Sequence, residues 1–401
     1  MGALYQAARA ADASCVMQTY GRKPILFERG EGSVLFDDDG RVYADFVSGI
    51  GAVNLGHAHP AVTEAIATQA AKLVHVSNWY YVEHRGELAC DVVRLLGGGM
   101  RVFFANSGAE ANEGAFKLAR KWAAQTRPGA HRIVTAERSF HGRTYAALAA
   151  TGQAGKQAAF APLPAGFDHV PLNDIAALDA ALDDTAAALM LEVVQGEGGV
   201  WPADPEYLAA AERMCRERGV LLMLDEVQTG FYRTGPAFAH QAFGLTPDVV
   251  TLAKAMANGL PIGAFVAREE VAAALVPGDH GSTFGGGPVV CAAGRATLAA
   301  LQAEACGANS LAMGERLRDG LRALASAGAP IADVRGSGLM VGASLVCAVA
   351  PDVVAGLLGR GFVVNHVGDA IVRFLPPLCV TAEQVDGVVA ALGESLEEVC
   401  A

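Results

Sequence analysis

The residue of this sequence best suited to covalent chemistry is Lys254. It follows an apolar run, Val249–Leu252, that is typical of a β-strand, and it precedes a glycine-containing turn. A lysine in apolar surroundings loses its proton more readily, so its amine can form a Schiff base with an aldehyde. Isolated lysines at strand ends are mostly surface residues. Lys254 therefore indicates a site only if other residues supply the rest of one.

A phosphate-binding turn is predicted where the apolar run 101–105 ends. Ser107, Gly108 and Ala109 follow this run, and a helical pattern begins there. The free N–H groups and the positive dipole end of a helix attract phosphate, and Gly108 lets the backbone approach it. An ordinary strand-to-helix turn with Ser107 as N-cap is the alternative. The glycine motifs that bind dinucleotides and ATP are absent from the sequence.

Charged and aromatic side chains elsewhere in the first 230 residues are further candidates for a site. Asp225 ends the apolar run Val220–Leu224, and a carboxylate there needs a cationic partner, such as a protonated pyridine nitrogen. Phe140 and Arg143 lie in a segment without periodicity, where the ring can stack on a planar group and the guanidinium can bind a carboxylate. The alternatives are a loop anchor for Phe140 and a surface ion pair for Arg143.

The elements that carry these residues predict an α/β fold. The apolar strand 187–194, a helix from Asp204 to Gly219 and the strand 220–224 form a repeating unit. Such units give a mostly parallel sheet with its sites at the carboxyl ends of the strands. Near the N-terminus, strands are expected at 25–27, 34–36 and 42–46. Beyond residue 289, helices at 290–305 and 308–327, mixed with short strands, predict a smaller α+β domain.

Composition excludes several classes of function. The formal net charge is −12 and no basic run occurs, which argues against nucleic acid as a partner. No apolar stretch is long enough to span a membrane, and no secretory signal is present. The eight cysteines include no CxxC pair, so free thiols in a reducing cytoplasm are expected. No metal site is predicted, because His57 and His59 lack further ligands at suitable spacing.

Taken together, these motifs resemble a known family. The segments FANSGAEANE, FHGRT, QGEGG, LDEVQTG and GSTFGG occur in that order, at 104–113, 140–144, 195–199, 224–230 and 281–286, with the Lys254 segment before the last. The chain resembles the class III (subgroup II) aminotransferases that depend on pyridoxal 5′-phosphate (PLP), and among them it is most similar to acetylornithine aminotransferases. The resemblance extends from about Tyr20 to the last helix.

The resemblance implies a fold and a reaction. The fold is PLP-dependent transferase fold type I, with a large domain built on a mostly parallel, seven-stranded-type sheet. We expect an N-terminal segment at 1–48 packed with the small domain, the PLP-binding domain at 49–289 and the small domain at 290–401. The reaction moves the terminal amino group of N-acetylornithine to 2-oxoglutarate by a ping-pong mechanism in arginine biosynthesis. Aminotransferases for ornithine, succinylornithine, succinyldiaminopimelate or 4-aminobutyrate are the alternatives.

The resemblance also implies the roles of individual residues. The catalytic residues are Lys254, which bonds to the cofactor and carries a proton, and Asp225, which keeps the pyridine nitrogen protonated. The other cofactor-binding residues are Ser107, Gly108, Ala109, Phe140, Glu226, Val227, Gln228 and, reaching in from the partner subunit of a homodimer, Thr283. The substrate-binding residues are Arg143, Ser282, Arg373 and Glu197.

Glu197 is implied to neutralise Arg373 when the amino donor is bound and to move away when glutamate brings its α-carboxylate. Three positions depart from the family pattern: Val193, Tyr232 and Gly287 replace a usual Pro, Gly and Asn. None of them removes a catalytic group. Tyr232 is bulky, and we expect it to bear on the choice of substrate rather than on the chemistry.

Overall fold

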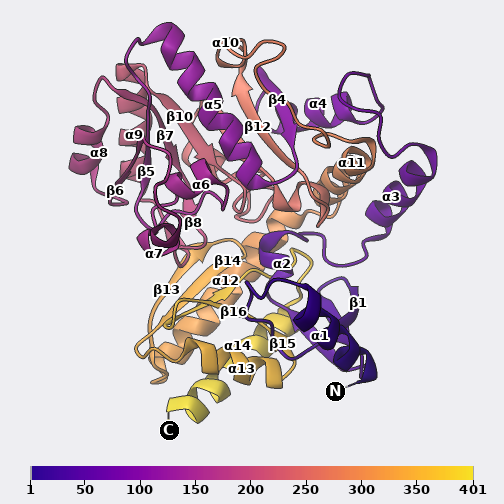
Figure 1. Ribbon diagram of the computed structural model, residues 1–401. Helices are drawn as coiled ribbons and strands as arrows, with labels where there is room; N and C mark the ends of the chain where they lie inside the picture. Colours follow the sequence, from indigo (N-terminus) through magenta and orange to yellow (C-terminus); the bar gives the residue numbers. More distant parts are fainter. Residues whose placement is uncertain (1, 401) are drawn as a thin grey trace.

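The structure, a computed structural model, describes residues 2–400 and is built around a seven-stranded sheet (Figure 1). Across the sheet the strands are β4 (Met100–Ala105), β12 (Gly263–Arg268), β11 (Val249–Leu252), β10 (Leu221–Asp225), β7 (Ala186–Leu191), β5 (Arg132–Ala136) and β6 (Phe167–Val170). Only β12 runs antiparallel to its neighbours. The prediction of a mostly parallel, seven-stranded sheet is confirmed.

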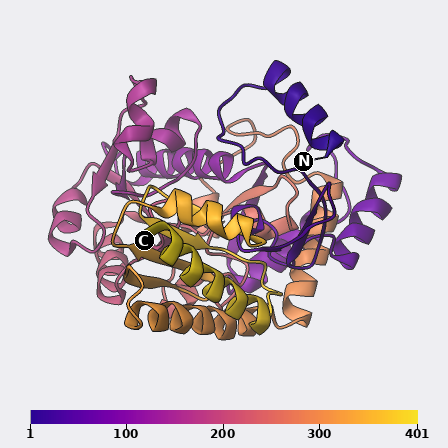
Figure 2. The ribbon, with the colours of Figure 1, turned by 90° about the horizontal axis from the view of Figure 1, so that it is seen from below.

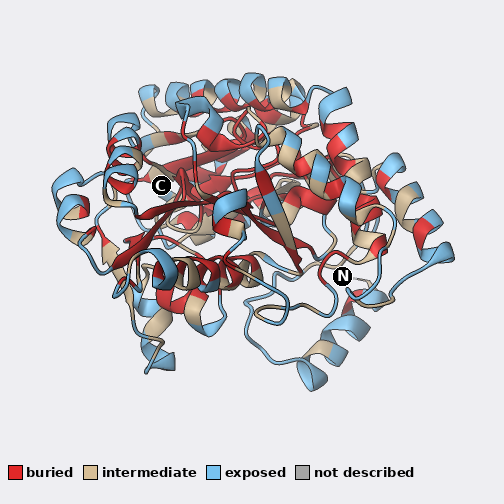
Figure 3. Ribbon diagram, turned by 90° about the horizontal axis from the view of Figure 1, so that it is seen from above, coloured by how far each residue is buried: buried red, intermediate tan, exposed pale blue. Residues whose placement is uncertain are grey.

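Helices cover both faces of this sheet, so its central strands are buried. Every residue of β7 and of β10 is buried, as expected for parallel strands that are packed on both sides. The buried strands lie inside a shell of helices whose outer surfaces are exposed (Figure 3). The helices of this part are α3 (Pro60–Lys72), α4 (Arg85–Leu95), α5 (Gly108–Thr126), α6 (Tyr145–Ala150), α7 (Ala154–Gln157), α8 (Ile175–Ala181), α9 (Pro205–Arg218) and α10 (Glu269–Ala272). Three short 3₁₀ helices are η1 (Ala158–Phe160), η2 (Ala239–Phe243) and η3 (Lys254–Ala257).

Helix α9 shows how local sequence sets an element's ends. Pro205 occupies the first turn, and Gly219 ends the helix with a φ of 63°, the left-handed conformation that glycine adopts without strain. Asp204 stands at the N-cap position, as predicted, but its side chain makes no capping hydrogen bond.

Two four-stranded sheets and the short antiparallel pair of β8 (Val194–Gln195) and β9 (Trp201–Pro202) complete the set of sheets. One has the order β13 (Ile331–Ser337), β14 (Met340–Leu345), β17 (Ile371–Phe374), β16 (Asn365–Val367). The other joins the chain's ends in the order β1 (Phe27–Glu31), β2 (Val34–Asp37), β3 (Val42–Asp45), β15 (Phe362–Val363), with β3 parallel to β15. The accompanying helices are α1 (Ala3–Cys15), α2 (Ser48–Gly51), α11 (Pro288–Ala303), α12 (Cys306–Ser326), α13 (Ala350–Gly359) and α14 (Ala382–Cys400). Seen from below, α1 lies at the edge of the molecule, apart from the C-terminal helices (Figure 2).

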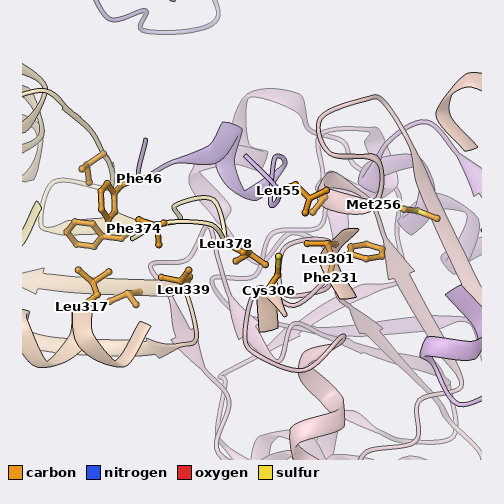
Figure 4. Packing of buried hydrophobic residues seen from close by; sticks show 14 of the residues in the cluster. Phe46, Leu55, Phe231, Met256, Leu301, Cys306, Leu317, Leu339, Phe374 and Leu378 are labelled. Atoms are coloured by element: carbon orange, nitrogen blue, oxygen red, sulfur yellow. The ribbon is translucent and has the colours of Figure 1, made fainter. Parts of the chain in front are cut away.

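One hydrophobic cluster links the two parts of the molecule. Phe46 and Phe374, whose ring centroids lie 6.3 Å apart, belong to the part with the small sheets. Leu378 and Leu339 continue the cluster toward Met256, at the base of the large sheet (Figure 4). A continuous apolar core of this kind holds the small sheets against the large one, since burying apolar area is the main stabilising contribution to folding.

The N-terminal strand prediction needs a correction. Strand β1 begins at Phe27 and continues to Glu31, whereas residues 25–27 were expected. The strand lies at the edge of its sheet and includes charged residues, so apolar composition does not mark it. Over residues 2–400, no helix is both long enough and apolar enough to cross a membrane.

Candidate active site

Lys254 lies at the wall of a cavity of about 380 Å³ at the carboxyl ends of the strands. It opens η3 directly after β11 and has a φ of 46°, a conformation that non-glycine residues seldom adopt and that clusters at functional sites. Burial lowers the pKa of Lys254, and the charge of Arg373 acts in the same direction, while Glu197 and Asp225 oppose it. The amine is therefore more readily available in its neutral, nucleophilic form than a surface lysine.

Asp225 forms the floor of this cavity within a buried hydrogen-bond network. It ends β10 and is 4% exposed. Its Oδ2 atom accepts a hydrogen bond from Asn112 Nδ2 at 2.9 Å and lies 2.8 Å from His141 Nδ1, while Oδ1 accepts one from Val227 N at 3.0 Å. Burial lowers the pKa of His141, but the hydrogen bond and charge of Asp225 outweigh that effect and raise it. This arrangement stabilises a carboxylate that faces the cavity.

The N-terminus of α5 opens onto the same cavity. Ser107 is its N-cap, and its Oγ accepts a hydrogen bond from Glu110 N at 3.2 Å. Gly108 and Ala109 line the cavity. A Cβ at Gly108 would lie 2.8 Å from Val227 Cγ1, so no larger residue fits without a shift. Free N–H groups and a close-approach glycine at a helix N-terminus are the features that bind phosphate.

Phe140 and Arg143 lie together on the loop between β5 and α6, and both line the cavity. The guanidinium carbon of Arg143 is 5.7 Å from the centroid of the Phe140 ring. Arg143 is exposed at this wall. The loop therefore presents an aromatic face and a cation to the same space.

Arg373 and Glu197 form an ion pair beside the cavity. Arg373 Nη1 donates to Glu197 Oε1 at 2.6 Å and to Gly196 O at 3.1 Å, and Nε donates to Asn365 Oδ1 at 3.2 Å. Arg373 is 1% exposed. Burial raises the pKa of Glu197, but the charge and hydrogen bond of Arg373 prevail and lower it. Glu197 thus stays ionised against a buried cation while itself lining the cavity.

Four predicted residues do not line this cavity: Arg373, which is linked to it through its ion pair with Glu197, and Ser282, Thr283 and Glu226. Ser282 and Thr283 line a different cavity, although Asn106 borders both and its Nδ2 donates to Ser282 Oγ at 3.2 Å. The Glu226 carboxylate turns away, and Oε1 accepts from the backbone N of His240 at 2.8 Å. Its neighbours in sequence, Val227 and Gln228, do line the cavity.

Three further residues of the cavity wall had no role in the sequence interpretation: Asn112, His141 and Glu192. Glu192 is the one charged residue of the apolar run 187–194. That anomaly, and the imidazole next to Phe140, were the available signals. Nothing in the sequence indicates that Asn112 would reach Asp225 from the second turn of α5.

The sequence profile of the family described as Aminotransferase class-III matches residues 16–396. The chain belongs to the class-III aminotransferases. This class-III aminotransferase is 48% identical to the acetylornithine aminotransferase of Caldanaerobacter subterraneus subsp. tengcongensis over 385 residues, covering 96% of this chain and 98% of the relative. It is 46% identical to the acetylornithine aminotransferase of Methanocaldococcus jannaschii, covering 96% of each chain.

Solved structures agree with this assignment. The class-III aminotransferase superposes on a Bacillus anthracis aminotransferase with a TM-score of 0.95 and 29% identity, covering 100% of both chains. It superposes on the ornithine aminotransferase of Toxoplasma gondii with a TM-score of 0.94 and 32% identity, covering 98% of this chain and 95% of the other. The protein is a PLP-dependent transaminase of fold type I.

The cavity of the class-III aminotransferase fits PLP on structural grounds. It combines a buried lysine, a buried carboxylate, an aromatic ring and a glycine-bearing helix N-terminus. The Oε1 atom of Gln228 is buried there and has no hydrogen-bond partner within residues 2–400. No cluster of three or more potential metal ligands is found in that same part of the chain.

The three departures from the family pattern lie outside the cavity wall. Val193 is 1% exposed, and Gly287 is the N-cap residue of α11. Tyr232 has a φ of 68°, and its ring packs near Gly307, where a Cβ would lie 3.0 Å from Tyr232 Cδ1. It packs against the hydrophobic core and does not line the cavity, so any effect of Tyr232 on the choice of substrate would be indirect.

Proposed function

We propose that this aminotransferase moves the terminal amino group of N-acetylornithine to 2-oxoglutarate by a ping-pong mechanism and serves arginine biosynthesis. The relatives at 46–48% identity carry the name acetylornithine aminotransferase. The observation that carries the proposal is the Arg373–Glu197 pair beside Arg143. Two carboxylate sites, one of them reversibly neutralised, suit a donor and an acceptor that differ in charge at one end.

PLP supplies an electrophilic aldehyde and a ring that accepts electrons. In this proposal Lys254 would hold the cofactor through its amine, and its Nζ would act as the general base and acid that carries a proton between the substrate carbon and the cofactor. Asp225 would pair with the pyridine nitrogen, and Phe140 would stack on the ring. Ser107, Gly108 and Ala109 would hold the phosphate, and Val227 and Gln228 would hold the ring.

Substrate choice follows from charge. Arg143 binds the carboxylate that both substrates share at the far end. N-acetylornithine brings its terminal amine and uncharged methylenes toward Arg373, so Glu197 stays in place and neutralises that cation. Glutamate brings its α-carboxylate to the same position, and Glu197 must then move aside. An unpaired buried charge is costly. N-acetylornithine therefore needs Glu197 paired with Arg373, and glutamate needs Glu197 displaced from it.

The remaining assignments belong to the same proposal. Thr283 acts across a homodimer interface and Ser282 lies near the substrate; both residues line a cavity other than the one that holds Lys254. Residues 49–289 form the cofactor-binding domain, between the segment 1–48 and the small domain 290–401. The pairing of β3 with β15 supports grouping the first segment with the last domain. A cytoplasmic location is supported by eight free cysteines.

The test is a set of half-reactions. PLP-loaded protein is mixed with N-acetylornithine, ornithine, succinylornithine or 4-aminobutyrate without an oxoacid, and the absorbance of the lysine-bound cofactor is followed. We expect the fastest conversion with N-acetylornithine, and recovery of the absorbance on adding 2-oxoglutarate. Ornithine is the important comparison, because a structural neighbour is an ornithine aminotransferase. Faster conversion with any other amine contradicts the substrate assignment, and Lys254→Ala is the control for non-enzymatic exchange.

A further inference from the structure

The loop that carries Glu197 is rich in glycine yet held along its backbone. It joins β8 (Val194–Gln195) to β9 (Trp201–Pro202), which pair antiparallel. Glycine loses more backbone freedom on ordering than any other residue, so three glycines within Gly196–Gly199 make this segment intrinsically mobile. Arg373 holds its first carbonyl. A second contact must fix the other end of the loop if the Glu197 carboxylate is to return to the same position against Arg373 each time.

Arg335, from β13, fixes that other end. Its Nε and Nη2 atoms donate to Gly199 O at 3.1 and 2.6 Å. Its guanidinium carbon lies 3.5 Å from the ring centroid of Trp201. Its Nη1 atom donates to Asp333 Oδ2 at 2.6 Å and to Ser344 Oγ at 2.7 Å. The side chain is thus held by its own sheet while two of its nitrogens donate to one carbonyl oxygen of the loop, a geometry that lysine cannot reproduce.

The middle of the loop is fixed as well. Trp201 Nε1 donates to Gly198 O at 3.0 Å. Gly199 has a φ of 114°, and a Cβ there would lie 2.5 Å from Ile371 Cδ1, on the strand that carries Arg373. The loop backbone therefore packs tightly against β17. The side chain of Glu197 has more freedom to move than the backbone that carries it.

We propose that Arg335 is a positioning residue for Glu197, holding the loop so that the carboxylate returns to Arg373 whenever no substrate carboxylate occupies that cation. The inference rests on the proposed alternation between a donor that leaves Arg373 to Glu197 and a glutamate that displaces it. Arg335 touches neither substrate nor cofactor. Its loss frees the loop, so Glu197 competes less effectively for Arg373.

The experiment compares the wild-type protein with the Arg335→Lys and Trp201→Phe variants, and all three proteins are loaded with PLP. The Trp201→Phe variant keeps a ring beneath Arg335 but removes the donor to Gly198. Glutarate, an unreactive dicarboxylate that needs both Arg143 and Arg373, is titrated by calorimetry. We expect it to bind roughly threefold to tenfold tighter to Arg335→Lys, since a freed loop must be ordered again before Glu197 can pair with Arg373, and that ordering costs conformational entropy. The ratio of glutamate to N-acetylornithine half-reaction efficiencies should rise by the same factor, with a smaller rise for Trp201→Phe.

A double-mutant cycle separates positioning from general damage. On a Glu197→Ala background, Arg335→Lys should change neither the glutarate affinity nor the ratio. Arg318→Lys is the matched control: Arg318 is 8% exposed, lies in the same part of the fold and donates to Gly338 O at 3.1 Å, away from the loop. It should leave both readouts unchanged, whatever its effect on melting temperature.

The result that overturns the proposal is an unchanged glutarate affinity with both half-reactions slowed equally in Arg335→Lys. The proposal is also overturned if Arg318→Lys shifts the ratio of glutamate to N-acetylornithine half-reaction efficiencies as much as Arg335→Lys does. If wild type does not convert N-acetylornithine, the substrate assignment fails by itself. Glutarate binding, together with glutamate and whichever amine reacts, then still decides the role of Arg335.

Discussion

Glu192 is a carboxyl group whose ionisation the folded protein resists. It is 6% exposed and accepts hydrogen bonds from Phe140 N at 3.0 Å and Gly196 N at 3.2 Å. Burial, the largest effect, together with the charge of Asp225, raises the pKa of Glu192 to about 7. His141 and the two backbone amides act in the opposite direction without cancelling the rise.

This raised pKa has a defined consequence for stability. In the unfolded chain the group titrates near 4.5, and in the folded state near 7. Between these values the folded protein keeps a proton that the unfolded chain releases, so the contribution of Glu192 to stability is greatest below pH 4.5 and is lost as the pH rises through 7. A difference of about 2.5 pH units, at about 1.4 kcal/mol per unit, gives a loss of about 3 kcal/mol.

Glu192→Gln removes this titration while keeping the shape of the protonated carboxyl. Urea midpoints of cofactor-free protein are measured from pH 5 to 8 at one protein concentration. We expect the variant to gain roughly 2 to 3 kcal/mol relative to wild type across that range. Glu217→Gln, on an exposed residue of α9, is the control and should follow wild type. Parallel curves for wild type and Glu192→Gln would refute an abnormally protonated Glu192.

Three further substitutions test the packing. Gly108→Ala places a Cβ 2.8 Å from Val227 Cγ1, so we expect PLP affinity in equilibrium dialysis to fall about tenfold; unchanged affinity would contradict the close-approach argument. Gly114→Ala places a Cβ 2.2 Å from Phe265 Cε1 and should lower the free energy of unfolding by about 1–3 kcal/mol, unless denaturant midpoints show that α5 shifts freely. Thr381→Ala removes the cap acceptor 3.3 Å from the backbone N at the start of α14 and should lower stability by about 1 kcal/mol, visible as a lower melting temperature.

Strands and their polar ends were predictable because both signals are local. The apolar run before Asp225 becomes β10, buried throughout, and its carboxylate faces the cavity. The turn after Ser107 opens α5 as expected. The last helix likewise starts with a local signal, the capping box of Thr381 and Gln384, in which Gln384 Oε1 accepts from Thr381 N at 3.0 Å.

The features that the sequence did not predict depend on contacts between segments that are far apart in the chain. Arg335 and Gly199 are joined by two hydrogen bonds although 136 residues separate them. No sequence pattern within either segment predicts this contact. Lys254 was interpreted as having no charged neighbours, because its neighbours in sequence are apolar. In the fold, Glu197, Arg373 and other charged groups from separate strands act on it.

The parallel pairing of β3 with β15 has a consequence for how the chain is made. Ala44 pairs with Phe362, so 318 residues of synthesis separate the two halves of one sheet. At about 5–20 residues per second, a ribosome leaves the edge of β3 without its partner strand for roughly 16 to 64 seconds. An unpaired edge is a template for pairing with other chains. A polypeptide truncated before Phe362 should therefore aggregate during expression, and slower translation should increase the dependence of the full chain on chaperones.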